Sequence, residues 1–225
     1  MKNLDIRQFC KKTVVVTGHF GCGKTNFSVN LSSSLSDFSD VYLADYDNIN
    51  PYFRAADAKE ELSGKNVKLI ASVFANTNVD IPSVPSDILG ALNMVSQGKS
   101  VVLDVGGDML GAVSLGYIHE KIVSNSNTAV YVFNAYRPLT STPTDALKVM
   151  REIEAACGLE ISYLVNNSNI GDATTVKDIE TTDGFAAELS RISGVPLLCT
   201  CFMTDEVPNV SGDVFKMKNY TKRIF

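Results

Sequence analysis

The sequence has no tryptophan, only two histidines and no C-x-x-C pair among its five cysteines. An odd number of cysteines within apolar stretches indicates reduced, buried thiols rather than disulfides or a zinc site. No apolar run approaches the roughly 20 residues that span a bilayer, and the opening MKNLDIRQFCKK lacks the apolar centre of a signal peptide. We therefore expect a cytoplasmic protein.

The sequence also lacks an excess of positive charge, internal repeats, low-complexity segments and linkers rich in proline and glycine. Its net charge is -5, which argues against a surface that binds nucleic acid without regard to sequence. With 225 residues, 45% of them apolar, the chain can bury a substantial core. We expect one domain spanning residues 1–225.

Apolar strands and amphipathic helices alternate along the whole chain. Patterns such as TDALKVMREIEAACG repeat apolar residues at intervals of three and four and are followed by glycine. This alternation predicts an α/β fold with a doubly wound, mostly parallel sheet and helices on both faces. The predicted strands are residues 13–17, 41–44, 67–71, 100–105, 129–133, 161–165 and 196–201.

The stretch VVVTGHFGCGKTNF, which begins at Val14, carries the most specific motif. Its glycine-rich part fits G-x-x-x-x-G-K-[ST] between a strand and a helix, which is the form of a phosphate-binding loop. Backbone N–H groups and the positive end of the helix can surround a β-phosphate, because glycines permit close approach and positive φ. The predicted cofactor-binding residues here are Gly18, Gly21, Cys22, Gly23, Lys24, Thr25 and Asn26.

Side chains of this loop have separate expected roles. We expect Lys24 to be an exposed lysine that reaches the β- and γ-phosphates, and the Thr25 hydroxyl to ligate Mg²⁺. Cys22, at a helix N-terminus, is either a tolerated small residue or a redox-sensitive thiol with a lowered pKa. The alternative for the whole motif is a glycine turn followed by an ordinary helix.

A second motif, SVVLDVGGDMLGA, is an apolar strand that ends in Asp104 and continues into a glycine turn and Asp108. This is the expected form of a Walker B segment. Asp104 can hold a water on Mg²⁺, while Gly106 and Gly107 let the backbone approach the γ-phosphate. The alternative is a strand end capped by a turn-forming aspartate, which the phosphate-binding loop makes less favoured.

Four stretches, GHFGCGKT, LADYDNINPYF, LDVGGDMLGA and YLVNNSN, have the order and spacing of the MinD/ParA-like ATPases. This P-loop family includes the nitrogenase iron protein and the ATPases of nickel and cobalt maturation. The chain resembles the family from Thr13 to about Val207, and is most similar to a bacterial subgroup with GHFGxGKT, DxDxxNPYFR and DVGGD. The resemblance implies a P-loop NTPase fold that binds ATP and Mg²⁺.

The resemblance also implies roles for acidic residues. Asp47 matches the family aspartate that positions or activates the attacking water, and Asp108 matches a second acidic residue near the γ-phosphate. Either could be the main one, and together with Lys24 they are the predicted catalytic residues. Asp45 lies on the same face of the strand end as Asp47. A polar turn is the alternative for both. The predicted metal ligands are Thr25, Asp45 and Asp104.

Asn166 follows the apolar strand ISYLV, where the family places an asparagine that hydrogen bonds to the adenine edge. An amide both donates and accepts hydrogen bonds, and the end of a parallel strand faces the ligand crevice. The alternative is an asparagine-rich turn. Residues 200–206 are expected to line the base pocket through their backbone.

Two departures limit what the resemblance implies. Many family members carry an extra lysine directly after the first loop glycine, which acts across an ATP-bound dimer, and here this position is His19. An imidazole does not replace a permanent ammonium, so a homodimer around ATP stays open but activation through this residue is doubtful. Arg54 is a candidate substitute. No cysteine lies between Cys22 and Cys157, which sets aside the iron–sulfur cluster of the iron protein.

The C-terminal VFKMKNYTKRIF, wound as a helix, would place Val214, Met217 and Tyr220 along one arc with basic residues around the rest. We expect this helix to pack on the protein's own sheet. The alternative is contact with a membrane, as made by relatives that end in basic amphipathic helices.

Together these features predict a Mg·ATP-binding switch. Slow hydrolysis would move residues 45–57 and 104–111 and so control an interaction with an unidentified protein partner. One alternative is an amidating ligase or small-molecule kinase whose loop NTNVDIPSVPSD holds the substrate. The other is a nucleotide-dependent scaffold with negligible turnover.

Overall fold

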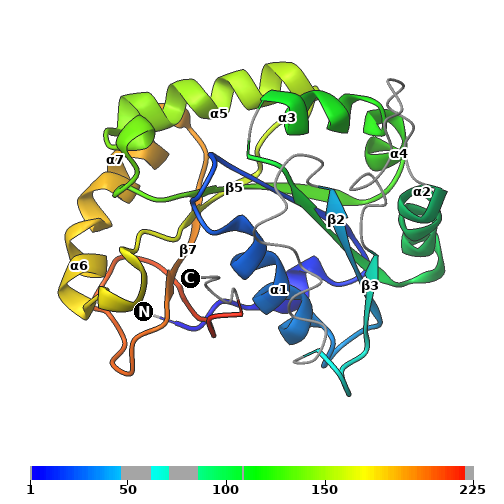
Figure 1. The fold of residues 1–225 in the computed structure, drawn as a ribbon, viewed down its shortest axis with the longest axis horizontal. Coiled ribbons are helices and arrows are strands. Elements are labelled where there is room, and N and C mark those ends of the chain that lie inside the picture. The colour runs from blue at the N-terminus through cyan, green and yellow to red at the C-terminus, as the bar shows by residue number, and fades with distance from the viewer. Residues whose placement is uncertain (1, 47–61, 71–85, 108, 221–225) are drawn as a thin grey trace.

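The computed structural model of the chain describes residues 2–46, 62–70, 86–107 and 109–220 (Figure 1). These residues form one parallel sheet in the order β3-β2-β4-β1-β5-β6-β7-β8. The strands are β1 (Thr13–Thr17), β2 (Val41–Tyr46), β3 (Val67–Ile70), β4 (Ser100–Val105), β5 (Asn127–Phe133), β6 (Tyr163–Asn166), β7 (Leu197–Phe202) and β8 (Val214–Lys216). The predicted parallel α/β sheet is confirmed.

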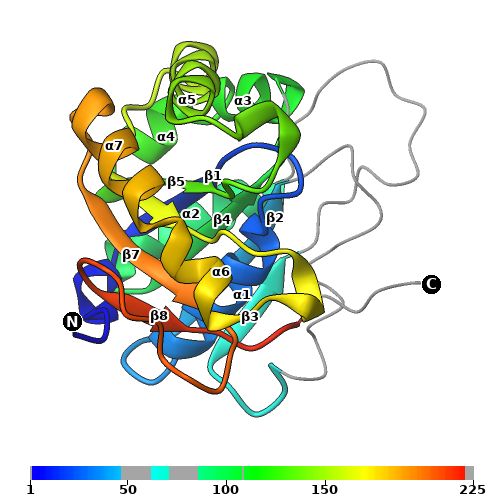
Figure 2. The same cartoon turned by 90° about the vertical axis from the view of Figure 1, so that its left-hand side faces the viewer.

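Helices cover both faces of this sheet, as predicted. Figure 2 shows α3 and α5 on one side of the strands and α1 on the other. Helices α2, α4 and α7 contribute apolar side chains to the same core as α3 and α5, whereas η1 shares the core of α1. The helices are η1 (Ile6–Phe9), α1 (Lys24–Leu35), α2 (Ser86–Asn93), η4 (Met94–Gln97), α3 (Met109–Gly116), α4 (His119–Val123), η5 (Pro138–Thr140), α5 (Pro143–Cys157), η6 (Gly171–Ala173), α6 (Val176–Thr181) and α7 (Asp183–Ser193). Among the described residues, none of these is long and apolar enough to cross a bilayer.

Helix α5 illustrates why the predicted helices form where they do. The hydroxyl of Thr142 caps the helix by accepting a hydrogen bond of 3.1 Å from the backbone N–H of Asp145. Pro143 occupies the first turn, where its missing N–H costs nothing. Gly158 ends the helix at a φ of 71°, a conformation that glycine adopts without strain.

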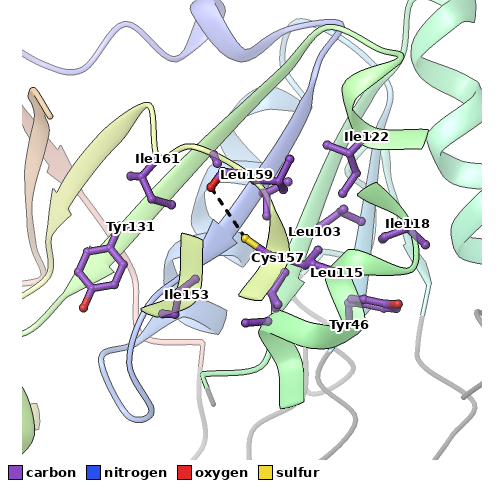
Figure 3. Close-up of a cluster of buried hydrophobic side chains, with 14 of the residues drawn as sticks. Tyr46, Leu103, Leu115, Ile118, Ile122, Tyr131, Ile153, Cys157, Leu159 and Ile161 are labelled. Carbon is purple, nitrogen blue, oxygen red and sulfur yellow. Dashed lines mark hydrogen bonds between the residues drawn. The ribbon is translucent and has the colours of Figure 1, made fainter. Parts of the chain in front are cut away.

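The core between the sheet and these helices is dense and apolar. Leu103 of β4 and Tyr131 of β5 belong to one buried cluster with Leu115 of α3 and Ile153 of α5 (Figure 3). Each fully buried side chain of this size contributes roughly 1.5–3 kcal/mol to folding. The carboxyl ends of the central strands are therefore held on a rigid support.

Strand boundaries differ from the predicted ones by up to two residues. Strand β2 continues past Ala44 through Asp45 to Tyr46, because its backbone stays paired with β4 as far as Val105. Strand β5 begins earlier than predicted, and β6 begins later. The extension of β2 matters for function, because it sets Asp45 directly beside Asp104 in the sheet.

The predicted C-terminal helix is wrong where the structure describes this segment, because residues 214–216 form the edge strand β8. Val214 donates its N–H to Lys2 O at 2.9 Å and accepts from Leu4 N at 3.0 Å, so the N-terminal segment covers this edge. The Phe215 ring packs edge-to-face on Phe27, 5.9 Å between centroids. The sequence FKMK alternates buried and exposed residues, a period of two that favours a strand. Contact with a membrane through an amphipathic helix is therefore not supported for the described part of this segment.

Candidate functional site

The glycine-rich loop joins β1 to α1 at the carboxyl edge of the sheet. Gly18, Gly21 and Gly23 adopt φ angles of 145°, 74° and 86°, which side chains with a Cβ rarely adopt. Gly23 is the N-cap of α1, so the first backbone N–H groups of that helix point into the loop without a side-chain cap. The loop thus has the geometry of an anion site at a helix N-terminus.

Lys24 is buried rather than exposed, which corrects the sequence expectation. Its side chain is 7% exposed, and Nζ donates to His19 O at 3.2 Å across the loop. A Cβ built on Gly107 would lie 2.3 Å from Lys24 Nζ and 2.7 Å from Phe20 N. The glycine turn after β4 therefore lies directly against both the lysine and the loop.

Asp104 lies at the centre of the candidate metal site. Ser28 Oγ donates to its carboxylate at 3.1 Å, and the Thr25 hydroxyl also hydrogen bonds to it. Asp45 is its register partner on β2, and both carboxylates are buried. Burial and the neighbouring charge of Asp45 raise the pKa of Asp104 to about 7, against the opposing hydrogen bonds and the charge of Lys24.

This donor set fits Mg²⁺ better than a softer metal. Thr25, Asp45 and Asp104 offer oxygen atoms at the end of the phosphate loop. Within the described ranges, no group of three or more histidine, cysteine, aspartate or glutamate side chains could form an all-protein cage. A Mg²⁺ ion here would depend on phosphate oxygens and water for its remaining ligands, as is usual for this ion.

A cavity of about 1110 Å³ opens beside the loop. Its phosphate end is lined by Gly21, Gly23, Lys24, Thr25 and Arg137. The wall continues through residues 167–172 after β6 and residues 201–205 at the end of β7. Ligand pockets of roughly 300–1,000 Å³ accommodate molecules of drug size. The segment expected to line a base pocket does line this cavity.

Asn166 does not face this cavity, which corrects its predicted contact with a base. The residue is fully buried, and its Nδ2 donates to Thr182 Oγ1 at 3.0 Å while Oδ1 accepts from Ser168 Oγ at 2.6 Å. With both ends of the amide engaged inside the protein, it orders the turn instead of reading a ligand. The sequence missed that Asn167 and Asn169, farther along the turn, line the cavity.

Asn167 ties this turn to the phosphate loop. Its Nδ2 donates to Cys22 O at 2.8 Å, and a Cβ on Gly23 would lie only 2.3 Å from the same nitrogen. The carbonyl oxygen of Cys22 is thereby satisfied within the protein and does not have to face a bound anion. Asn169 Nδ2 in turn donates to Asn167 O at 2.8 Å. The turn after β6 therefore helps to hold the loop in its anion-binding shape.

Asn26 lines the cavity but uses its side chain for a structural contact. Its Oδ1 accepts from Tyr220 N at 2.9 Å. One turn later, Asn30 accepts from Lys218 N at 2.8 Å and donates to Lys218 O at 2.9 Å. The two asparagines clamp the segment after β8 along α1, which places Lys216 and Lys218 in the cavity wall. Asn26 Nδ2 donates to Met203 Sδ at 3.6 Å, so both ends of this amide have partners within the protein and its predicted contact with a ligand is not supported.

Two titrating groups in the loop behave differently. Burial raises the pKa of the Cys22 thiol despite the charges of Lys24 and Arg137, so a lowered pKa and a redox gate are not supported. Burial lowers the pKa of His19, and the same two charges lower it further. The imidazole is therefore neutral at pH 7, and cannot replace a permanent ammonium.

Three residues with predicted roles lie outside the described residues. They are Asp47, Asp108 and Arg54, and their roles stay predictions. Arg137, by contrast, was missed by the sequence analysis, because it belongs to no motif and reaches the loop only through the pairing of β1 with β5.

Comparisons with known proteins bear on the fold. No family model and no curated protein matches the chain. Among solved structures, FtsY of Mycoplasma mycoides is similar at a TM-score of 0.59 and 16% identity, covering 88% of this chain and 61% of that protein. The fold is that of a P-loop NTPase. FtsY of Thermotoga maritima gives a TM-score of 0.58 at 18% identity, over 88% of this chain and 63% of the other.

A third similar structure is the 54 kDa signal recognition particle protein of Aeropyrum pernix K1, solved in complex with GDP. It has a TM-score of 0.59 and 14% identity, and the match covers 93% of this chain and 42% of that protein. The chain thus spans about three fifths of the FtsY proteins. At such low identity, the likeness concerns the P-loop NTPase fold alone.

The first loop glycine provides a test of this P-loop NTPase fold. A Cβ at Gly18 would lie 2.1 Å from the Val132 carbonyl oxygen, and this contact is backbone that cannot rotate away. We expect Gly18→Ala to lower the free energy of unfolding by about 2–5 kcal/mol, from steric overlap and positive-φ strain together. Gly98→Ala is the matched control, since Gly98 also has positive φ but nothing within 4 Å, and should cost about 1 kcal/mol. Equal losses in urea unfolding would contradict the close contact.

Proposed function

We propose that the chain binds a Mg²⁺–nucleoside triphosphate in this cavity and hydrolyses it slowly as a switch acting on a protein partner. The observation that carries the proposal is that Lys24 and Thr25 line one end of a cavity of about 1110 Å³, with Asp104 hydrogen bonded to Thr25 behind them. A helix N-terminus, an ammonium and buried oxygen donors together match the chemistry of a phosphate chain with its metal.

Each side chain has a task in this proposal. Lys24 exchanges its hydrogen bond to His19 O for phosphate oxygens, whose charge compensates the buried ammonium. Thr25 and Asp104 hold Mg²⁺ directly or through water, with Asp45 beside them. The bound ion supplies charge neutralisation between the phosphate oxygens. Asp47 and Asp108 remain the candidates that orient the attacking water.

The switching role is supported by a contact between the first segment expected to move and α3, the helix that begins within the second. Tyr46, the last residue of β2, donates its hydroxyl to Ser114 O in α3 at 2.8 Å. Strand β2 leads into residues 45–57, and α3 follows the turn after β4. A displacement on one side is therefore transmitted to the other, which is what a two-segment switch requires.

The identity of the base has two candidates. The resemblance to MinD/ParA-like proteins favours ATP, whereas a structurally similar protein of the signal recognition particle was solved with GDP, which favours GTP. The adenine contact expected of Asn166 no longer supports ATP, because that amide is engaged internally. The amides of Asn167 and Asn169, which also line the cavity, donate to Cys22 O and to Asn167 O, so they favour neither purine.

We further propose a cytoplasmic protein of one domain whose turnover is slow until a partner binds. His19 is neutral at pH 7, so the described loop residues supply Lys24 as their only permanent cation. P-loop NTPases that lack an activating cation turn over slowly. A homodimer around the nucleotide remains one form that the protein partner could take.

The test is to titrate the purified protein with ATP and GTP, with Mg²⁺ or with EDTA, and to follow phosphate release. We expect micromolar or tighter binding of one purine nucleotide and slow release without additives. Thr25→Ala should lose roughly tenfold of the affinity that depends on Mg²⁺, since it removes one ligand. Thr144→Ala, at an exposed position of α5, is the control and should bind as wild type. Absence of binding by the wild type would overturn the proposal, and binding without release would favour the scaffold.

A further inference from the structure

Arg137, in the turn after β5, lies against the phosphate loop. A Cβ built on Gly21 would stand 3.1 Å from Arg137 Cζ and 3.3 Å from Nε. The guanidinium therefore lies close to the loop backbone, and a side chain at position 21 would have to displace it slightly. Gly21 and Arg137 both line the phosphate end of the cavity.

The turn presents this arginine from a fixed position. Arg137 N donates to Asn134 O at 3.1 Å, and Thr140 N donates to Arg137 O at 3.0 Å. Asn134 Oδ1 also accepts from Tyr136 N at 2.9 Å, and the Tyr136 hydroxyl donates to Asp178 O at 2.7 Å. Pro138 follows directly and restricts the backbone further. Only the side chain of Arg137 has to adjust when a ligand binds.

The charge of Arg137 acts on the loop and is not neutralised by a carboxylate there. Where the structure describes the chain, the ion pairs involve other basic residues, and Arg137 is in none of them. The charge of Arg137 is felt in the loop: it acts to lower the pKa values of His19 and Cys22. Arg137 and Lys24 line the same end of the cavity, and the repulsion between their positive charges is relieved when an anion binds there.

The strand order indicates which part of a nucleotide this cation meets. Strand β4, which leads from Asp104 into the turn of Gly107, lies on one side of β1, and β5, which leads into the turn of Arg137, lies on the other. The metal and the terminal phosphate belong to the β4 side. Beyond β5 comes β6, and the turn that follows it continues the cavity wall through residues 168–172, where the nucleoside would lie. Arg137 thus stands between the terminal phosphate and the nucleoside.

We propose that Arg137 binds the non-terminal phosphates of the nucleotide, as a second cation supplied by the same chain on the side of the loop opposite Asp104. The inference rests on the proposed function and adds a phosphate-binding residue that lies outside the loop motif. A guanidinium presents paired N–H donors that match two phosphate oxygens, which an ammonium does not.

The experiment measures the affinity of wild type, Arg137→Ala and Arg137→Lys for the nucleoside triphosphate and diphosphate of the preferred base. We expect Arg137→Ala to weaken both by the same factor, roughly ten- to a hundredfold, as for a lost charge-assisted contact. Arg137→Lys should recover part of the loss. The affinity of Arg137→Ala should also depend less steeply on salt. Arg191→Ala, an exposed arginine paired with Glu188 on α7, is the control and should bind as wild type.

The outcomes separate this inference from the proposed function. If wild type binds neither ATP nor GTP, the proposed function fails. If wild type binds and Arg137→Ala binds equally well, or loses affinity for the triphosphate alone, the assignment to non-terminal phosphates is overturned while the proposed function stands. Thermal melting checks the fold, and since Arg137 is exposed we expect unchanged melting in both variants.

Discussion

Replacing Lys24 with methionine is expected to weaken binding of the Mg²⁺–nucleotide by roughly thirty- to a thousandfold, because a buried ammonium that faces phosphate contributes about 2–4 kcal/mol. Methionine keeps the unbranched stem, so the loss isolates the charge. The effect should be larger than that of any other single substitution in the loop, since Lys24 is 7% exposed and has little competing water. Isothermal titration with the preferred nucleotide measures it.

The fold should survive this change. Burial of an ammonium opposes folding, and the hydrogen bond of Lys24 Nζ is to a single carbonyl, His19 O. We therefore expect the free energy of unfolding of Lys24→Met to equal or exceed that of wild type. Lys177→Met, which replaces an exposed lysine on α6 that does not line the cavity, should leave both affinity and stability unchanged. Wild-type affinity in Lys24→Met would show that the loop does not bind phosphate.

Without metal or nucleotide, the protein is expected to be less stable at pH 8 than at pH 5.5. The pKa of Asp104 is raised from 3.8 to about 7, chiefly by burial and then by the charge of Asp45. The folded chain therefore holds a proton that the unfolded chain has released, and stability falls as pH rises between about 4 and 7. At about 1.4 kcal/mol per pKa unit, the contribution of Asp104 is at most on the order of 4 kcal/mol.

Asp104→Asn should remove this dependence, because a carboxamide stays neutral at every pH. In urea unfolding with EDTA, the variant should match wild type only below about pH 4, and its advantage in stability should grow from there to about pH 7 and persist at pH 8. Adding Mg²⁺ at pH 8 should make wild type more stable than Asp104→Asn, since the cation stabilises the carboxylate. Asp178→Asn is a control of opposite sign, because hydrogen bonds from Thr175 lower the pKa of Asp178. Identical pH profiles for wild type and Asp104→Asn would refute the buried-carboxylate account.

Much of the fold and the loop could be predicted because their signals are local. Apolar runs mark seven strands, and the glycine motif marks the loop, since both depend on neighbouring residues. The strand β8 was misjudged because Val214, Met217 and Tyr220 also fit one helical arc. What decided for a strand was pairing with residues 2–4 and packing on Phe27, and neither leaves a trace in the local sequence.

The parts of the site that were missed depend on contacts between distant segments. Asn166 is withdrawn from the cavity by Thr182, 16 residues away, whereas Cys22 loses its expected acidity through burial that no loop motif reveals. Arg137 reaches Gly21 because β1 and β5 are neighbours in the sheet, although the two residues lie 116 positions apart in the sequence. Sequence patterns give the type of side chain at each strand end, and packing decides which of them faces the ligand.

The clamp of Asn26 and Asn30 on residues 218–220 has a consequence for biosynthesis. The phosphate helix is made early, yet its partners in the clamp lie 188 to 194 positions later in the chain. Contacts of such long separation form late, since the intervening chain must first be ordered. A ribosome has to pass Tyr220 before the cavity wall formed by Lys216 and Lys218 can close. The nascent chain is therefore expected to acquire nucleotide affinity only after residues 216–220 have left the exit tunnel.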